Sequence, residues 1–192
     1  MYKPFAECLN KRATKMKDDI RDIIVKYGKD ILLSEEFQAT FSQTHHMSTT
    51  VGDHTLGVVT EAVKICLRHG LTDDETLRNT VTASLCHDLG IMGRKEKFNN
   101  NVQCLVQHPK QSAESYISMT GEHNERVLDS ILCHMFPLKI RFPRYKEGWI
   151  LMLADKIGTS REKIGRPSVT DSDRDELMRA ASRSHTADAM DV

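Results

Sequence analysis

The dipeptide His87-Asp88 ends an apolar run, ASLCHDLG, and both of its side chains can bind a metal ion. Neither side chain is stable in a core without a partner, because burying a polar or ionised group costs free energy. Four further candidate ligands occur in other apolar segments: His54 in VGDHTLGVV, His108 in LVQHPKQSA, His134 in ILCHMFPL and Asp155 in LMLADKIG. The order His, His-Asp, His, His, Asp therefore indicates a metal centre.

Helical spacing turns three of these side chains toward the core. Asp88 follows Leu85 by three residues, and His134 follows Ile131 by three. Asp155 repeats the pattern three residues after a methionine. A single residue of this kind is more often a hydrogen-bonded core group than a ligand. Three of them on separate helices, together with His87 and His54, favour a shared metal site, because facing helices commonly build such sites.

Oxygen and imidazole ligands without thiolates suit several divalent ions. We expect iron or manganese first, with zinc, magnesium and nickel as alternatives. Six ligands are enough for two ions, and we assign the bridging, catalytic position to Asp88. A bound divalent ion lowers the pKa of its water and neutralises charge on phosphoryl oxygens, so the pattern favours hydrolysis of a phosphate ester or anhydride.

The composition of the chain limits the classes of protein to which it can belong. A chain of 192 residues that is 39% apolar can bury one core. Lys and Arg number 27, as do Asp and Glu, so no overall field attracts nucleic acid or a membrane. No apolar stretch is long enough for a membrane span and no signal core is visible, so we expect a cytoplasmic protein with a small phosphorylated substrate. The five cysteines form no CxxC pair and are expected to pack in the core.

The elements that position these residues are predicted to be helices, because the helical period recurs and strand alternation does not persist. The predicted fold class is all-α, a helical bundle with the metal centre between helices. The expected helices cover residues 5–27, 34–42, 54–69, 72–90, 109–119, 122–135 and 145–161. Their ends rest on Gly28 as a stop, Asp53 as an N-cap, Gly70 as a C-cap and Pro109 at a first helical position.

We divide the chain into an N-terminal helical region (1–44), a core (45–165) and a polar tail (166–192) that is frayed or partly helical.

The segment GRKEKFNNN follows the His-Asp pair and is placed to overhang the site. Arg94 and Lys95 within it are candidate substrate cations, with a solvated connection as the competing interpretation. His46, eight residues before His54, is a candidate for substrate binding or for supporting the site. The remaining histidines lie outside the pattern: His45, His69, His123 and His185.

The segments DHTLGVVTEAVKICLRHG, ASLCHDLG, HPKQSAESY, ILCHM and LADKIGTSR resemble the HD-domain superfamily of metal-dependent phosphohydrolases over about residues 46–162. Within it they look most similar to the symmetrical bis(5′-nucleosyl)-tetraphosphatases, which split diadenosine tetraphosphate, while HMFPLKIRFPRYKEGW resembles uncharacterised bacterial HD proteins. The resemblance implies one metal site at His54, His87, Asp88 and Asp155, and a second completed by His108 and His134. It also implies that Arg161 is a candidate phosphate contact, with an ordinary surface arginine as the alternative.

Three functions remain in competition. The leading hypothesis is hydrolysis of a nucleotide or dinucleoside polyphosphate at a dinuclear centre. A phosphodiesterase acting on a cyclic nucleotide or cyclic dinucleotide is disfavoured, because such members often read HDIGK and here Leu89, Gly90 and Ile91 follow the pair without the lysine. A binding module in which a metal only joins helices is disfavoured by six ligands, because structural sites use about four.

Overall fold

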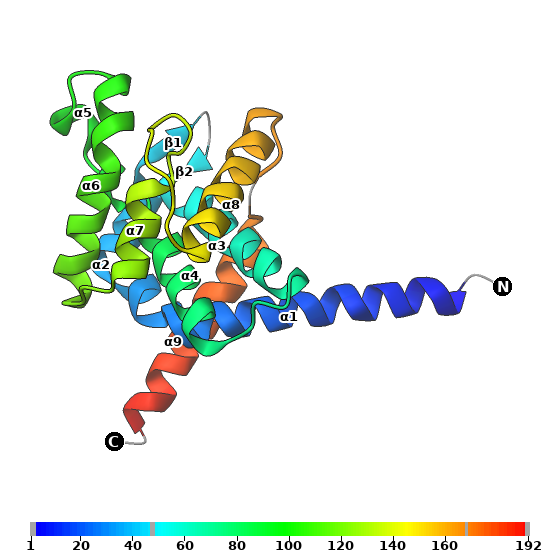
Figure 1. Cartoon of the computed structure of the whole chain (residues 1–192). Coiled ribbons are helices and arrows are strands. Elements are labelled where there is room, and N and C mark those ends of the chain that lie inside the picture. The colour runs from blue at the N-terminus through cyan, green and yellow to red at the C-terminus, as the bar shows by residue number, and fades with distance from the viewer. Residues whose placement is uncertain (1–2, 47–48, 168, 191–192) are drawn as a thin grey trace.

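The computed structural model describes residues 3–46, 49–167 and 169–190, and most of them are helical (Figure 1). The all-α prediction is confirmed. The longer helices are α1 (Lys3–Leu33), α3 (Val51–Arg68), α4 (Asp74–Cys86), α6 (Asn101–Thr120), α7 (Glu125–Cys133), α8 (Lys146–Lys163) and α9 (Asp171–Met190). The shorter pieces are α2 (Glu35–Ala39), α5 (Arg94–Lys97) and the 3-10 helices η1 (Thr40–Ser42) and η2 (Leu89–Ile91). Strands β1 (Thr44–His46) and β2 (Thr49–Thr50) pair antiparallel.

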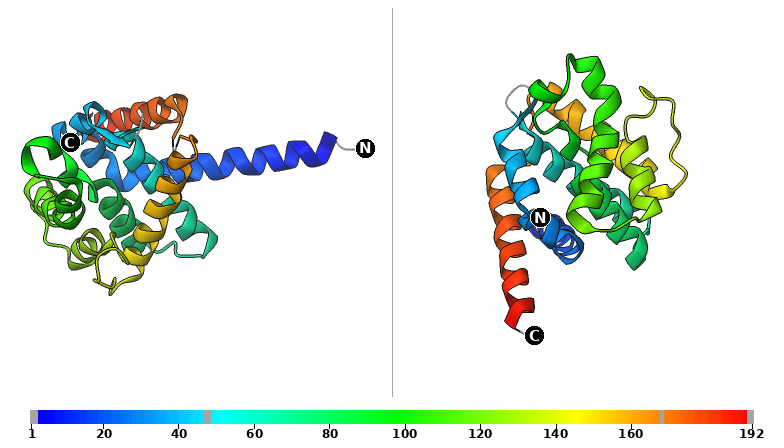
Figure 2. Two further views of the ribbon diagram at one scale, coloured as in Figure 1. Left: turned by 90° about the horizontal axis from the view of Figure 1, so that it is seen from above. Right: turned by 90° about the vertical axis from the view of Figure 1, so that its left-hand side faces the viewer.

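Helix α3 lies at the centre of the bundle, packed between α4 and α8. Its Val59, Ala62 and Val63 have no exposed surface, and apolar residues occur around most of its circumference, as expected of a helix covered on several sides. Helix α7 packs on α4 and α8, and α6 packs on α7 and η2. Helices α1 and α9 lie side by side along one flank (Figure 2).

Helix α1 continues through Gly28, where the sequence predicted its end, and so the predicted stop is wrong. A Cβ atom at position 28 would lie 2.5 Å from Cδ1 of Leu85. The glycine therefore serves close contact between α1 and α4 and does not end the helix. As a result, α1 carries Ile31 and Leu32 into the core.

Helix α3 begins three residues earlier than predicted, because its N-cap is Thr50 and not Asp53. The Thr50 hydroxyl accepts a hydrogen bond from the backbone N–H of Asp53, which places His54 within the first turns of the helix. At the other end, Gly70 has a φ of 68° and follows the C-cap residue His69 by one position.

Helix α4 begins after its N-cap Asp73, whose carboxylate accepts from the backbone N–H of Thr76. It ends at Cys86, four residues before the predicted end at Gly90. The helical spacing predicted that Asp88 lies on the apolar face of this helix, and that prediction is wrong. Asp88 lies beyond the helix, with φ −112° and ψ 7°.

The largest differences from the sequence prediction concern α6 and α9. Helix α6 is capped by Asn100 and begins eight residues before Pro109, which lies inside it, so the predicted start at Pro109 is wrong. The predicted overhanging loop contains the short helix α5. The polar tail forms α9, which packs on α1 through residues that include Leu177 and Ala181. Among the described helices, none has both the length and the apolar character that a membrane span needs.

Candidate metal centre

Two of the predicted ligand histidines cap the ends of helices. His87 is the C-cap of α4, and its Nδ1–H donates to the carbonyl of Ser84 at 2.8 Å. His134 is the C-cap of α7, and its Nδ1–H donates to the carbonyl of Ile131 at 2.6 Å. Because a carbonyl can only accept, each ring carries its proton on Nδ1. Both Nε2 atoms are therefore left to face the cluster.

His108 is held in the same way from the middle of α6, since its Nδ1–H donates to the carbonyl of Cys104 at 2.9 Å. The position of α6 relative to the His-Asp pair depends on Gly90. A Cβ atom there would lie 2.3 Å from the carbonyl oxygen of His108, and the Gly90 N–H donates to Oγ of Ser112 at 2.9 Å. The missing side chain thus lets η2 contact α6 and brings His108 beside Asp88.

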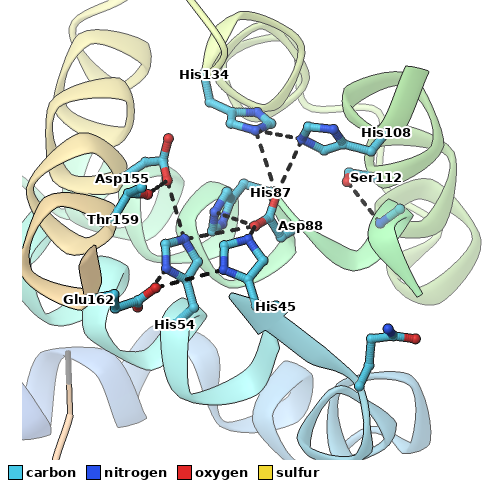
Figure 3. A network of polar contacts seen from close by, with 12 residues as sticks. His45, His54, His87, Asp88, His108, Ser112, His134, Asp155, Thr159 and Glu162 are labelled. Carbon is cyan, nitrogen blue, oxygen red and sulfur yellow. Dashed lines mark hydrogen bonds and ion pairs between the residues drawn. The ribbon is translucent and has the colours of Figure 1, made fainter. Parts of the chain in front are cut away.

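The Asp88 carboxylate lies at the centre of the cluster, and its two oxygens face different imidazoles (Figure 3). Oδ1 is 3.3 Å from Nε2 of His108 and 3.6 Å from Nε2 of His134. Oδ2 is 3.3 Å from Nε2 of both His45 and His87, and 3.8 Å from that of His54. Each carboxylate oxygen therefore points toward a separate group of nitrogen donors.

His54 connects this cluster to α8. Its Nε2 lies 3.2 Å from Oδ1 of Asp155, and its Nδ1 lies 2.9 Å from Oε1 of Glu162. Thr159 donates from its hydroxyl to the same Asp155 oxygen at 3.4 Å. The structure thus brings together all six residues that the sequence singled out as ligands, from five separate segments of the chain.

Sequence reasoning placed His45 outside the site, and this is wrong. His45 on β1 is buried, contacts Asp88, and stacks on His54 with ring centroids 4.1 Å apart. The signal was the doublet His45-His46, because neighbouring residues of a strand point to opposite faces. The side chain of His46 lies outside the described part of the chain, and its role stays a prediction.

Glu162 was also missed. Glu162 lies in the last turns of α8. Its side chain is buried and accepts a hydrogen bond from His54. It follows Asp155 by seven residues, which is about two helical turns and places both carboxylates on one face. The neighbouring Arg161 was chosen instead because of the family resemblance, and its guanidinium pairs with Glu61 on α3 at 2.9 Å.

The histidines and carboxylates shift one another's pKa values. Burial opposes the charged form of His45, but hydrogen bonds to Asp88 and Glu162 raise its pKa to about 9. Burial likewise opposes charge on His54, whose carboxylate partners raise its pKa to about 9. Burial disfavours the anion of Asp88, yet His87, His108 and His45 hold its pKa well below the ordinary value. The centre of the cluster is therefore an anion surrounded by groups that supply positive charge.

The other half of the cluster has too few protons for its contacts. Nε2 of His108 and Nε2 of His134 lie 2.9 Å apart, and both rings already donate their Nδ1–H to carbonyls. Burial and the nearby histidines lower the pKa of His134 to about 3, so a proton between these nitrogens is unfavourable. Nε2 of His87 is buried and makes no hydrogen bond with a described residue. These donors fit a divalent cation better than they fit one another.

The described donors form three sets, within each of which the ligand atoms lie no more than 4.8 Å apart. The sets are His45, His54 and Asp88; His54, His87 and Asp155; and Asp88, His108 and His134. They contain only nitrogen and oxygen donors. Cys86 and Cys133, each next to a ligand histidine, are buried free thiols, and the Cys133 thiol lies 3.5 Å from the carbonyl of Phe142.

The three basic residues predicted to contact the substrate differ in where they lie relative to the cluster of histidines and carboxylates. Arg94 on α5 donates from Nη1 to the carbonyl of His45 at 3.2 Å, which fixes it beside the cluster. Lys95 is exposed on the same short helix. Arg161 is directed to Glu61 by its ion pair, and the structure does not bring it into the cluster.

A family model of the HD domain matches residues 51–160, a span that contains all six predicted ligands. The chain belongs to the HD domain family. Membership implies a metal-dependent phosphohydrolase type of activity, and the buried His and Asp groups are compatible with it. The superfamily resemblance seen in the sequence is thereby confirmed, whereas nothing supports the tetraphosphatase subgroup. Neither a curated protein nor a solved structure matches the chain.

Proposed function

We propose that this HD domain protein is a phosphohydrolase with a dinuclear metal centre that acts on a nucleotide or dinucleoside polyphosphate. The observation that carries the proposal is the orientation of Asp88. Its Oδ1 faces His108 and His134, and its Oδ2 faces His45 and His87. A carboxylate whose oxygens address two donor sets is suited to bridge two cations.

The residues divide naturally between two ions. His54, His87 and Asp155 would hold one, and His108 and His134 the other, with Asp88 shared. When bound, such ions supply a water of lowered pKa and stabilise negative charge on phosphoryl oxygens. The chain itself fixes the imidazole tautomers through the carbonyls of Ser84, Cys104 and Ile131, so that the Nε2 donors do not reorganise during the reaction.

We expect a substrate to approach the cluster from the side of Asp155. Its side chain is 14% exposed, whereas the side chains of His54 and Asp88 are 0% and 4% exposed. Two cations lie beside the cluster: Arg94 donates to the His45 carbonyl, and Lys156 donates to the His134 carbonyl at 3.3 Å. Within the described part of the chain, the side-chain hydrogen bonds of both cations go to backbone carbonyls and neither cation forms an ion pair with a carboxylate, which leaves their charge for a phosphate.

Turnover by the metal-loaded protein tests the proposal. The purified chain, supplied with iron or manganese, is assayed on mononucleotides, dinucleoside polyphosphates, cyclic nucleotides and cyclic dinucleotides. Release of phosphate or nucleotide from the first two classes is expected. Cleavage confined to the cyclic compounds would favour the phosphodiesterase alternative.

The role of cations is tested by a matched pair of variants. Arg94→Ala should raise KM or lower kcat/KM by about tenfold, equivalent to about 1.4 kcal/mol, with metal content unchanged. Arg161→Ala separates the two interpretations of that residue. A similar kinetic loss would support the phosphate contact that the family resemblance implies. Unchanged kinetics with a lower unfolding temperature would assign Arg161 to the ion pair with Glu61.

A binding module in which the metal joins helices is the second candidate, and the burial of the cluster favours it. The side chains of His54, His87 and His134 are at most 1% exposed. A protein that holds its full complement of metal and cleaves none of the compounds above would establish this alternative.

A further inference from the structure

The N-terminal part of α1 extends away from the body of the molecule (Figures 1 and 2). Residues 13–17 are all exposed, and Ile20 is the first buried residue after them. A helix that lacks tertiary contacts is only marginally stable in water, because most helical stability in proteins comes from packing. Packing against a partner would therefore stabilise the extended part of α1.

An apolar groove of about 350 Å³ opens where this part of α1 leaves the body, between α1, α3 and α9. Its walls include Ala13, Met16 and Ile20 of α1, and Val169 and Leu177 from the C-terminal part of the chain. Ala13, Met16 and Ile20 are spaced by three and four residues, so they form one stripe along the helix. Met16 is 42% exposed. The groove and the stripe together are suited to a second helix.

The charges of α1 indicate which helix that is. Residues 11–17 include Lys11, Arg12, Lys15 and Lys17 and no acid, whereas residues 18–22 include Asp18, Asp19 and Asp22 and a single Arg21. A helix with a basic segment followed by an acidic one is complementary to an antiparallel copy of itself. With a two-fold axis near residue 17, Lys15 of each copy faces Asp19 of the other.

Acidic residues of α9 extend this complementarity along the groove. Asp173 and Glu176 line it, where they pair with Lys17 and Arg21 of the same chain. A basic segment from a second copy that enters the groove would meet the same carboxylates. A partner of unlike sequence would have to reproduce both the apolar stripe and the order of charges, whereas a second copy has both.

We propose that the chain forms a two-fold symmetric dimer in which the extended parts of two α1 helices pair antiparallel, each lying in the groove of the other copy. Such an interface is isologous, since the same surface is used by both chains. It does not involve the metal cluster, and it stands whether or not the proposed hydrolase activity is found.

Sedimentation equilibrium of the full chain and of two variants tests the surface. The parent protein is expected to be dimeric in the micromolar range. Met16→Glu should weaken the dimer by about tenfold or more in dissociation constant, because it places a carboxylate in an apolar contact. Ile164→Glu, which changes an apolar residue that is 68% exposed outside α1, is the control and should leave the dimer intact. A monomeric parent, or a dimer that tolerates Met16→Glu, would overturn the proposal.

The antiparallel register is tested by exchanging charges. Lys15→Glu and Asp19→Lys should each weaken the dimer, since each sets like charges against one another. Mixing the two variants should restore it as a heterodimer, in which both cross-chain contacts again have opposite charges. Mixing cannot repair a loss of contacts within one helix, so recovery identifies contact between chains. Failure to recover on mixing would rule out this pairing.

Discussion

Asp88 must remain ionised for the cluster to hold cations, and its environment secures this. Imidazoles on both sides of the carboxylate hold its pKa well below the ordinary value although it is buried. A buried anion of this kind needs compensating positive charge, which protons on histidines or bound metal ions can supply. Its two oxygens thus couple the two halves of the centre.

Replacing Asp88 by asparagine should therefore remove metal without changing the size of the side chain. We expect metal content, measured by elemental analysis, to fall by one ion per chain or more, and turnover to fall by about 100-fold or more. Asp129→Asn is the control, because Asp129 is also a buried carboxylate but pairs with Arg144. Equal metal content in the parent and Asp88→Asn proteins would contradict the bridging role.

Glu162 contacts Nδ1 of His54, and we expect it to orient that imidazole. Removing the carboxylate in Glu162→Ala should lower metal affinity by about 10-fold to 100-fold, because outer contacts orient a ligand imidazole and raise its basicity. Glu162→Gln keeps an oxygen that accepts the Nδ1–H and should lose less. Metal titration with both variants checks this order, and unchanged metal affinity in both would show that Glu162 does not influence the metal site through His54.

The sequence predicted six members of the cluster but not the residues that complete it. Those six residues were recognisable because a histidine or aspartate in an apolar run is costly unless it is paired. His45 and Glu162 lie in short or polar contexts, where a charged residue is unremarkable. Both also lie outside the span 51–160 that the HD domain model matches, so the family pattern offers no signal for them.

At the scale of elements, the contact between η2 and α6 decides whether Asp88 reaches His108. Gly90→Ala would place a methyl group 2.3 Å from a backbone oxygen and force the two segments apart. We expect a loss of about 1–3 kcal/mol in unfolding free energy, measured by urea denaturation, and loss of the ion held by His108 and His134. Ser112→Ala removes only the hydrogen bond from Gly90 and should cost about 1 kcal/mol. Full metal retention in Gly90→Ala would contradict this account.

The start of α4 gives a prediction about pH. Hydrogen bonds from the side chain and backbone of Thr76, with a contribution from Lys146, lower the pKa of Asp73 from the ordinary 3.8 to about 2. The pKa of Asp73 is lower in the folded state than in the unfolded state. The ionised cap therefore stabilises the fold fully at pH values above the unfolded-state pKa, and this stabilisation is lost as the pH falls toward 2. Asp73→Asn keeps a capping oxygen without the charge. The stability difference between parent and variant should therefore shrink between about pH 5 and about pH 2 in denaturation experiments. A difference that does not change with pH would show that the charge is unimportant.

Local sequence rules predicted that helices exist more reliably than where they end. Gly28 and Pro109 are usual stop and start signals, yet both lie inside helices. At Gly28 the reason is the tertiary contact with Leu85. At Pro109 it is that the helix is already capped by Asn100, nine residues upstream. The sequence predicted a tail that is frayed or partly helical and not the full length of α9, because few of the residues of α9 are apolar. The helix is held by α1 through a narrow strip that includes Leu177 and Ala181.

At the scale of the whole molecule, the metal centre joins segments that are far apart in the chain. Its residues come from β1, α3, the end of α4, α6, α7 and α8, so a bound ion connects most of the bundle. An unfolded chain cannot present these ligands together, and metal binding is therefore linked to folding. The centre should stabilise the fold as well as supply chemistry.

Removal of metal should consequently lower the unfolding temperature of the whole domain. A ligand present at about 100 times its dissociation constant adds about 2.7 kcal/mol to the stability of the folded state. For a chain of this size each kcal/mol corresponds to about 2–4 °C, so a chelator should lower the melting temperature by about 5–10 °C. Calorimetry with and without chelator measures the shift, and added iron or manganese should reverse it. The Asp88→Asn variant supplies the control, because a protein that no longer binds metal should melt at the same temperature with and without chelator. If the parent protein releases its metal to the chelator and its melting temperature does not change, the helices hold the ligand geometry without the ions.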